Sequence, residues 1–382
     1  MEKVVSILQE ISNQNSYAVM ELSQVSMKQL QQKKDAAEKA KENPFADFND
    51  VDMLTWYIHE QKHANQANDR SMRTKKEYER EIRHFIAAIL SHTEAIDVDI
   101  DKIRGQSLFK SLESRHLRRY QEWLMTESPY VLERGPYSPA TISRKTTILK
   151  SFFRYLYRVG YIQGDIAEGL RIASVRKDDR PDRDLGPQDV VKILRSFRTI
   201  NHPVMFSIVL VLTATGLRNE ELCKLKVSDV KKDRIHGGYY LNVVGKGNKK
   251  RQIPLKEKVY DSIRMYRYAR GLPSLAESRF DAPLFTTSRG TAFSPSYLIA
   301  YMTKEMKKID SELEGIEVKL TPHVFRHAFA ITSRLGGADL FDIMRSLGHE
   351  KMETTMIYLE KVFAREKNAV NQWAPDVLEE FI

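Results

Sequence analysis

Apolar residues recur at alternating intervals of four and three along the first part of the chain. The stripe predicts a helix and consists of Val4, Leu8, Ile11, Ala18, Leu22 and Val25. Its polar member is Asn15, and a buried asparagine at such a position fixes the register of a coiled coil. A helix packed on its own domain explains the stripe equally well. After Leu30 the periodicity is lost up to Pro44, so we expect residues 1–45 to be a helical extension that ends in a polar connector.

Helical spacing continues from residue 46 to about residue 165. It predicts helices over 53–62, 73–90, 114–125 and 141–159. The run SVRKDDRPDRD then combines dense charge with Pro181, which is typical of an exposed linker between domains. We therefore expect a helical domain over 46–173 and a linker over 174–187.

The pattern is mixed after this linker. An apolar helix is predicted over 204–214, and the strand-like runs YYLNVV and RQIPL follow at 239–244 and 251–255. The sequence GKGN between the two runs is a turn signature and predicts a hairpin. Helical spacing returns after Leu255, Pro295 and Pro322, and from Asp339 onward. The expected fold class is mainly α with a small β-sheet, with a mixed α+β domain over 188–365 and no internal repeat.

Composition narrows the class of partner. The chain has 382 residues, with 61 Lys and Arg against 51 Asp and Glu and a formal charge of +10, which favours a polyanion such as nucleic acid. The single cysteine, Cys223, excludes an intrachain disulfide and is expected to be a core residue in a reducing compartment. No apolar run is long enough for a membrane span, and MEKVVSILQE is not a signal peptide. These features predict a soluble, cytoplasmic protein.

Two segments place cationic or imidazole side chains beside helix ends. In TATGLRNEEL, Gly216 breaks an apolar helix and Arg218 follows at once, which can direct a guanidinium into a cleft. In TPHVFRHAFA, Thr321 is the expected N-cap, so His323 and Arg326 share a face near the helix N-terminus. Such a position favours a bound anion.

A third segment, IMRSLGHEKMETTMIYLEKV, carries a tyrosine. Gly348 is expected to end one helix, His349 to lie in the connection and Tyr358 to lie in the next helix. Taken singly, each of these residue types is ordinarily structural, and His327 is expected to be packed rather than functional. The combination carries the information.

The stretches TGLRNEEL, GKGNKKRQIPL, TPHVFRHAFA and LGHEKMETTMIYLE follow one another in the order and local settings of the tyrosine recombinase motifs. Over about residues 185–365 the chain resembles enzymes of the lambda integrase, Xer and Cre type, with looser support from 50–165. The resemblance implies a site-specific DNA recombinase whose helical core-binding domain and catalytic domain form a C-shaped clamp on DNA. It implies the catalytic residues Arg218, Lys246, His323, Arg326, His349 and Tyr358.

The resemblance also implies a role for each residue. The two arginines clamp the scissile phosphate, the two histidines bond it or assist proton transfer, and Tyr358 forms a 3′-phosphotyrosine. Lys246 protonates the departing 5′ oxygen, and its G-K-G setting favours it over Lys249 and Lys250. Glu221 supports the first arginine. Paired guanidiniums suit the charge that develops on a phosphate, and a covalent intermediate conserves the bond energy, so neither a cofactor nor a metal is implied.

Further basic residues are expected to contact the DNA backbone. The segment 143–160 interleaves cations with apolar residues, which suits a helix that packs on one side and faces phosphates on the other. A solvated basic face is the alternative. The candidate contacts are Arg144, Lys145, Lys150, Arg154, Arg158, Lys249 and Lys250. The acidic, apolar segment 366–382 is expected to dock on a neighbouring protomer, or otherwise on its own domain.

The expected partners are double-stranded DNA with specific recombination sites, further copies of this chain in a tetramer on paired sites, and accessory DNA-bending proteins. The expected reaction is integration, excision or resolution of a phage, plasmid or other mobile element, at the nucleoid. A type IB topoisomerase shares the chemistry but acts as a monomer, and a DNA-binding module without catalysis would not need the whole residue set. The two-domain layout and the tail expected to dock on a neighbouring protomer favour a recombinase over the topoisomerase, and the complete set of six residues argues against the module.

Overall fold

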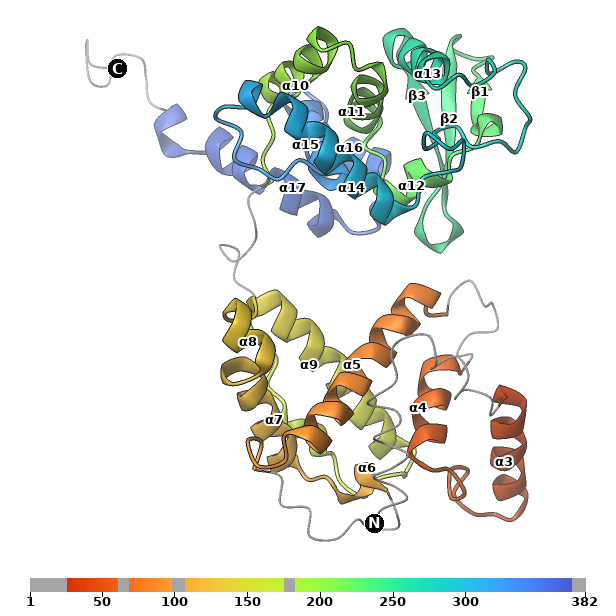
Figure 1. Ribbon diagram of the computed structural model, residues 1–382, viewed down its shortest axis with the longest axis vertical. Helices are drawn as coiled ribbons and strands as arrows, with labels where there is room; N and C mark the ends of the chain where they lie inside the picture. Colours follow the sequence, from red (N-terminus) through yellow and green to blue (C-terminus); the bar gives the residue numbers. More distant parts are fainter. Residues whose placement is uncertain (1–25, 61–68, 98–106, 175–182, 373–382) are drawn as a thin grey trace. The chain divides into compact units, whose positions relative to one another are not determined.

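The computed structural model describes residues 26–60, 69–97, 107–174 and 183–372 (Figure 1). It divides into two compact units, Met1–Pro181 and Asp182–Ile382. The predicted N-terminal stripe with Asn15 lies outside the described residues, and so does the tail from Trp373 onward. No described helix combines the length and the apolarity that crossing a membrane requires.

The first unit is helical throughout its described residues. Its helices are α3 (Met27–Lys39), α4 (Asp50–His59), α5 (Met72–Ser91), α6 (Leu108–Ser111), α7 (Ser114–Thr126), α8 (Pro129–Arg134), α9 (Pro139–Arg158) and the 3₁₀ turn η3 (Ile166–Gly169). The four helices predicted from periodicity are confirmed as α4, α5, α7 and α9. Two of them begin after a serine N-cap, since Ser71 and Ser138 accept from the backbone N–H groups of Thr74 and Thr141.

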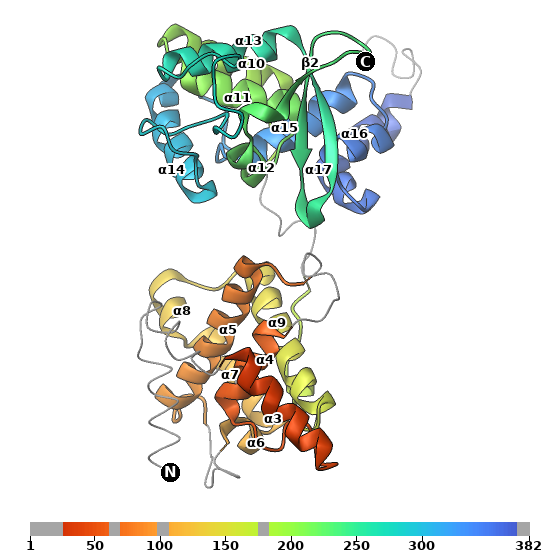
Figure 2. The ribbon, with the colours of Figure 1, turned by 90° about the vertical axis from the view of Figure 1, so that its right-hand side faces the viewer.

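The predicted polar connector after Leu30 is wrong. Helix α3 occupies most of that segment and begins with a capping box, in which Ser26 and Gln29 bond to each other's backbone N–H. Leu30 and Ala37 are buried two helical turns apart, at 0% and 4% exposure. Figure 2 shows α3 beside α4, so this helix is part of the first unit. The sequence pattern did not predict α3, because its buried apolar stripe has only two positions among many charged residues.

Helix α9 is the centre of the first unit's core. Phe152 and Phe153 are both 0% exposed. The ring of Phe152 contacts Tyr57 and Phe109 at centroid distances of 5.1 and 5.2 Å, and the ring of Phe153 contacts Phe85 at 5.4 Å. One face of α9 is thereby fixed in the core, and its other positions carry the cations of the 143–160 segment.

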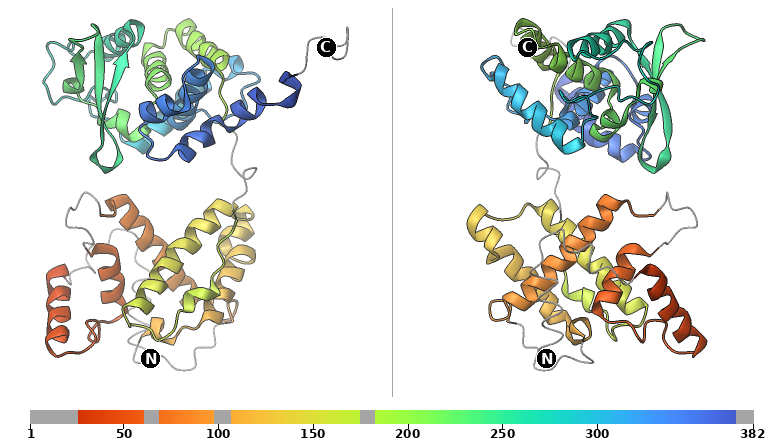
Figure 3. Two further views of the ribbon diagram at one scale, coloured as in Figure 1. Left: turned by 180° about the vertical axis from the view of Figure 1, so that it is seen from behind. Right: turned by 45° about the vertical axis from the view of Figure 1, so that its right-hand side comes forward.

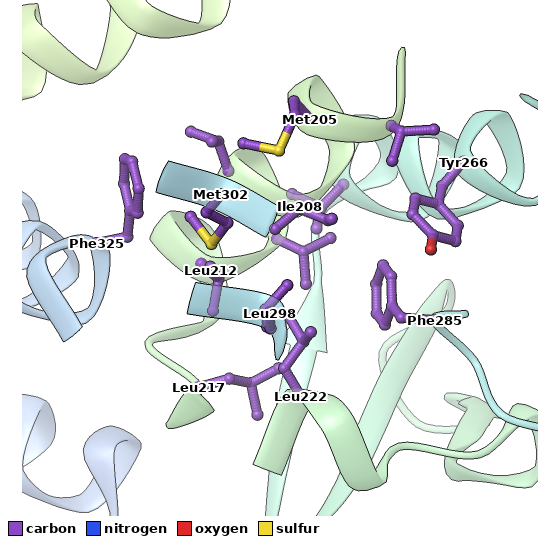
Figure 4. Packing of buried hydrophobic residues seen from close by; sticks show 14 of the residues in the cluster. Met205, Ile208, Leu212, Leu217, Leu222, Tyr266, Phe285, Leu298, Met302 and Phe325 are labelled. Carbon is purple, nitrogen blue, oxygen red and sulfur yellow. The ribbon is translucent and has the colours of Figure 1, made fainter. Parts of the chain in front are cut away.

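The second unit contains helices and one small sheet, as the fold-class prediction requires (Figures 1 and 3). Its helices are α10 (Pro187–Thr199), α11 (Pro203–Thr215), α12 (Asn219–Lys224), α13 (Glu257–Ala269), α14 (Pro295–Met306), α15 (Pro322–Leu335), α16 (Leu340–Leu347) and α17 (Met352–Glu366). Helix α11 is the central one: Met205, Ile208 and Leu212 are each 0% exposed. Figure 4 shows them among side chains from several segments, including Leu298 and Met302 of α14.

The sheet is antiparallel in the order β1-β2-β3, with β1 at Val230–Lys232, β2 at Tyr239–Val244 and β3 at Lys250–Leu255. Strands β2 and β3 confirm the predicted hairpin, whereas β1 is too short to show a sequence pattern. The connecting turn η6 (Lys246–Asn248) has positive φ at Gly247, 72°, and at Asn248, 61°. Side chains alternate along β3, so Arg251 shares a face with the buried residues Ile253 and Leu255. Figure 3 shows the sheet at one side of the helices.

Candidate active site

Arg218 is held in place by the first turn of its own helix. Gly216 ends α11 in a left-handed conformation, φ 59°, as predicted. Arg218 is then the N-cap of α12. One carboxylate oxygen of Glu221 accepts from the Arg218 backbone N–H at 2.8 Å, and the other accepts from Arg218 Nη1 at 2.9 Å. The Arg218 side chain is 35% exposed, so its guanidinium is oriented and still accessible.

A second guanidinium, that of Arg251 on β3, binds the same carboxylate. Arg251 Nη1 and Nη2 donate to the two oxygens of Glu221 at 2.9 and 2.8 Å, and its Nε donates to the carbonyl of Ser346 at 3.0 Å. Burial alone would raise the pKa of Glu221, but the hydrogen bonds and charge of Arg251 outweigh it and lower that pKa to about 2. The sequence did not reveal Arg251 as a site residue, although it is a cation on the inward face of a predicted strand.

Arg326 on α15 is the most deeply buried cation of the site, at 1% exposure. Its helix begins as predicted, with Thr321 at the N-cap position and a proline next to it. Nη1 donates to the carbonyl of Gly216, and Nη2 donates to the carbonyl of Leu347 at 2.8 Å. Burial and then the charge of Arg218 lower the pKa of Arg326 to about 10. The guanidinium remains charged at neutral pH and is fixed by backbone oxygens.

His349 lies in the connection between α16 and α17, as predicted. Its Nε2 is 2.8 Å from Nη2 of Arg326, which can only donate, so Nε2 is the acceptor. Nδ1 therefore carries the proton and donates to Thr355 Oγ1 at 2.9 Å. Burial and then the charges of Arg326 and Arg218 lower the pKa of His349 to about 3. The imidazole is neutral and its tautomer is fixed by its two partners.

Tyr358 on α17 is surrounded by imidazoles. Its ring centroid lies 5.7 Å from that of His323, 4.6 Å from that of His327 and 5.4 Å from that of His349. Burial and then the charge of Arg183 lower the pKa of His323 to about 4. The second unit thus brings together five of the predicted catalytic residues, Arg218, His323, Arg326, His349 and Tyr358. His327 is packed, as predicted, and its Nε2 also lies 2.9 Å from the carbonyl oxygen of Tyr358.

Lys246 lies in the turn between β2 and β3, and its side chain is outside the described part. The backbone just before it runs beside the site, because a Cβ added at Gly245 would lie 3.2 Å from Oε1 of Glu221. Of the two alternative lysines, Lys249 pairs with Glu350 at 2.8 Å, and Lys250 is exposed at the start of β3.

The basic residues of α9 fall into two groups. Near its N-terminus, Arg144 donates to both carboxylate oxygens of Glu77 at 2.9 and 2.7 Å, and Lys145 pairs with Glu81 at 2.6 Å. Further along, three cations line a cavity of about 430 Å³ together with hydroxyl and apolar side chains. The lining residues are Tyr57, Thr147, Lys150, Ser151, Arg154, Tyr155, Arg158 and Ile172.

Comparisons with known proteins show which proteins this chain is similar to. A model of the phage integrase family matches residues 183–365. The tyrosine recombinase XerC of Chlorobaculum parvum is 30% identical over 268 residues, which are 64% of this chain and 76% of the relative. The tyrosine recombinase XerD of Proteus mirabilis is 34% identical over 246 residues, which are 63% of this chain and 74% of the relative.

The fold is shared with solved structures as well. The Tn1549 transposon integrase, solved in complex with circular intermediate DNA, matches with a TM-score of 0.55 at 19% identity over 83% of this chain and 98% of that chain. Arginines, imidazoles and a tyrosine lie together in one site, which is the residue set that the sequence analysis predicts for a DNA strand-transfer enzyme. The chain belongs to the tyrosine recombinase family, whose members cut and rejoin DNA.

Proposed function

We propose that this chain is a site-specific DNA recombinase that cleaves DNA by attack of Tyr358 on a backbone phosphate and rejoins it by the reverse reaction. The observation that carries the proposal is the position of Tyr358, whose ring contacts the rings of His323 and His349. His349 in turn accepts from Arg326. A phenol, two neutral imidazoles and a buried guanidinium therefore meet in one site.

The charge balance of the site suits a phosphoryl transition state. Three guanidiniums, those of Arg218, Arg251 and Arg326, are countered by the carboxylate of Glu221, which leaves two positive charges. A phosphodiester under attack carries two negative charges on its nonbridging oxygens in the pentacoordinate state. Donors that are already oriented stabilise this charge without reorganisation, and Arg326 and Arg218 are oriented by their hydrogen bonds.

Proton transfer has separate acceptors and donors. The phenol of Tyr358 must lose a proton as it attacks, and the neutral imidazole of His323 can accept one. The departing 5′ oxygen needs a proton at the same time, and we assign this role to Lys246 because the backbone at Gly245 lies beside Glu221. His349, whose Nε2 accepts from Arg326 and whose Nδ1 donates to Thr355, orients that guanidinium toward the phosphate.

A covalent-trapping assay tests the proposal. Duplex fragments from the DNA that flanks the encoding gene, nicked so that the strand beyond the cleavage point is lost, should yield a protein–DNA adduct that survives denaturing electrophoresis. Tyr358→Phe should bind the same fragments and form no adduct, because it lacks one oxygen and keeps the charge pattern. With paired unnicked sites, recombinant products support the recombinase, whereas relaxation of supercoils alone or binding alone would contradict it.

We further propose that the cavity face of α9 contacts the DNA backbone. Arg154 is 59% exposed and lies 3.8 Å from Asp165, whereas Arg144 is paired with both oxygens of Glu77. The affinity for DNA falls as salt rises, and each lost phosphate contact reduces the magnitude of the slope of log affinity against log salt concentration by about 1. Arg154→Gln combined with Arg158→Gln should therefore reduce this magnitude by about 2. The single control, Arg144→Gln, should leave the slope nearly unchanged, and a change of about 1 in the control would contradict the assignment.

Assembly on paired sites as a tetramer is also a proposal, with the C-terminal tail as the docking segment. The described start of the tail is held within its own unit, because Glu366 pairs with Arg334 at 2.9 Å. A truncation after Gln372 keeps this ion pair and removes the residues from Trp373 onward. It should leave single-site binding unchanged and weaken paired-site complexes in native gels. Equal assembly by the truncated chain at matched occupancy would rule out this role.

A further inference from the structure

His327 connects two segments of the second unit that are far apart in sequence. The residue is 6% exposed and follows Arg326 on α15. Its Nε2 lies 2.9 Å from the carbonyl oxygen of Tyr358, and its Nδ1 lies 3.1 Å from the carbonyl oxygen of Arg183. Both partners can only accept. The imidazole of His327 thus lies between the backbone of α17 at Tyr358 and the backbone of Arg183, at the start of the second unit.

The neutral form of this imidazole can donate to only one of its two carbonyl partners. Burial lowers the pKa of His327, against the opposing charge of Asp184, so the ring is predominantly neutral at physiological pH and has one N–H. We place that hydrogen on Nε2, because the contact with Tyr358 is the shorter of the two. The ring of His327 also lies 4.6 Å from the ring of Tyr358, so one side chain contacts both the backbone and the phenol of the nucleophile.

A second contact joins the same two segments. Asp184 Oδ2 lies 3.0 Å from Nζ of Lys361, and Leu185 is 0% exposed in the core of the unit. Lys361 comes three residues after Tyr358, so the two lie on neighbouring positions of one face of α17. The segment 183–185 is thus anchored by Leu185 and bound to α17 through the Asp184–Lys361 ion pair.

We infer that His327 is a positioning residue for cleavage: its Nε2–H fixes the backbone of Tyr358 relative to Arg326, and the Asp184–Lys361 pair ties the same helix to the start of the second unit. The inference rests on the proposed role of Tyr358 as nucleophile. Arg326 and His327 are adjacent on one helix. The hydrogen bond from His327 to the backbone of Tyr358 therefore sets the distance between the guanidinium of Arg326 and the phenol oxygen of Tyr358. A reacting atom displaced by about 1 Å can cost about 10²-fold in rate.

Two amide substitutions separate the roles of the ring nitrogens. The amide nitrogen of glutamine falls near the Nε2 position of histidine, and that of asparagine falls near Nδ1. His327→Gln should therefore keep the donor to Tyr358, and His327→Asn should lose it while keeping a polar group of similar size. Single-turnover cleavage of a nicked duplex at saturating enzyme should fall by about 10²-fold in His327→Asn. His327→Gln should retain most of the rate, and both variants should keep the wild-type Kd for DNA.

Hydrogen exchange in the free protein gives a readout that does not depend on DNA. Peptides that cover α17 should exchange faster in His327→Asn than in wild type or in His327→Gln. Lys361→Met, which breaks the second tie, should speed exchange in peptides that cover residues 183–187 and lower cleavage less than His327→Asn does. Helix α13 is the internal reference, because it is far from both ties in sequence and should exchange equally in all variants.

The outcomes are distinguishable. Rescue of both cleavage and α17 exchange by glutamine, but not by asparagine, supports the inference. Equal loss in the two variants, accompanied by faster exchange throughout the second unit, would show a general packing role and overturn it. Unchanged α17 exchange in His327→Asn would also overturn it. If the wild-type chain forms no adduct with any DNA, the proposed function fails, and the exchange experiment still decides whether the tie exists.

Discussion

Replacing Arg251 with methionine would test how the site holds Arg218. Glu221 accepts four hydrogen bonds, two from Arg218 and two from Arg251, at 2.8 to 2.9 Å. Arg251→Met removes two of these four hydrogen bonds. The carboxylate of Glu221, whose side chain is 5% exposed, then keeps only the two donors of Arg218. Methionine fills much of the arginine volume, so the loss is mainly electrostatic. Removing one partner of a buried ion pair costs about 3–5 kcal/mol of unfolding free energy.

A double-mutant cycle isolates this interaction. Glu221→Gln removes the charge that Arg251 balances, so the combination of both substitutions should destabilise the protein by less than the sum of the single changes. Contacting ion pairs show coupling energies of about 0.5–3 kcal/mol, and the upper half of that range is expected for this buried pair. Trp56 and Trp123 belong to the first unit, so their fluorescence would not follow unfolding of the second unit. Unfolding in urea should therefore be followed by hydrogen exchange of peptides from 183–372. Additive losses would refute the reasoning.

The same variant should weaken a pH dependence of stability. Glu221 has a pKa of about 2 in the folded protein, against about 4.3 in the unfolded chain. Its contribution to stability is therefore complete above the unfolded value and is lost as the pH falls from about 4.3 toward 2. Arg251→Met removes two of the four donors to Glu221, so the folded pKa should lie closer to the unfolded value and the loss of stability between about pH 4.3 and 2 should become smaller. An unchanged slope of stability against pH would contradict this account.

Three further predictions follow from the site. Cleavage should persist in excess EDTA, because guanidiniums hold the phosphate, and activity restored only by magnesium would contradict this. Lys246→Ala should cleave an ordinary phosphodiester about 10²- to 10⁴-fold more slowly than wild type. It should cleave a substrate with sulfur at the bridging 5′ position nearly as well as wild type, because a thiolate leaves without a general acid. Arg326→Ala should show no such rescue. His349 has a folded pKa of about 3, below the unfolded value of about 6.5, so the protein should lose stability as the pH falls below about 6.5. His349→Gln should lose less, as measured by Tm against pH.

Much of the fold could be predicted because its helices have regular apolar faces. The 3.6-residue period located α5 and α9, and the alternation in YYLNVV located β2. The prediction failed at α3, where Leu30 and Ala37 are the buried positions among many polar residues. Serine caps shifted the starts of α5 and α9 toward the N-terminus, because a cap is set by one hydrogen bond and leaves no periodic trace.

The site was predictable only where its residues lie in recognisable local motifs. Arg218, Arg326 and Tyr358 each stand in such a motif, and the structure brings them together. Arg251 and His327 have no local mark of their roles, because their partners lie elsewhere in the sequence. Arg251 binds Glu221 and Ser346, which are 30 and 95 residues away. Contacts between residues so far apart depend on how β3 and α15 pack against the other segments, which a local sequence pattern does not predict.

The partners of Arg326 explain how a buried cation keeps its charge for the phosphate contact that we propose. Its guanidinium donates to the carbonyl of Gly216, the residue that caps α11, and to that of Leu347, the last residue of α16. Carbonyls at helix C-termini have no partner within their helix and carry the negative end of the helix dipole. They stabilise the cation without cancelling its full charge, as a carboxylate would. The carboxylate of the site, that of Glu221, is instead shared by Arg218 and Arg251. Arg326 is 1% exposed and thus retains a whole positive charge in a low-dielectric setting, where its attraction for a phosphate is stronger than it would be in bulk water.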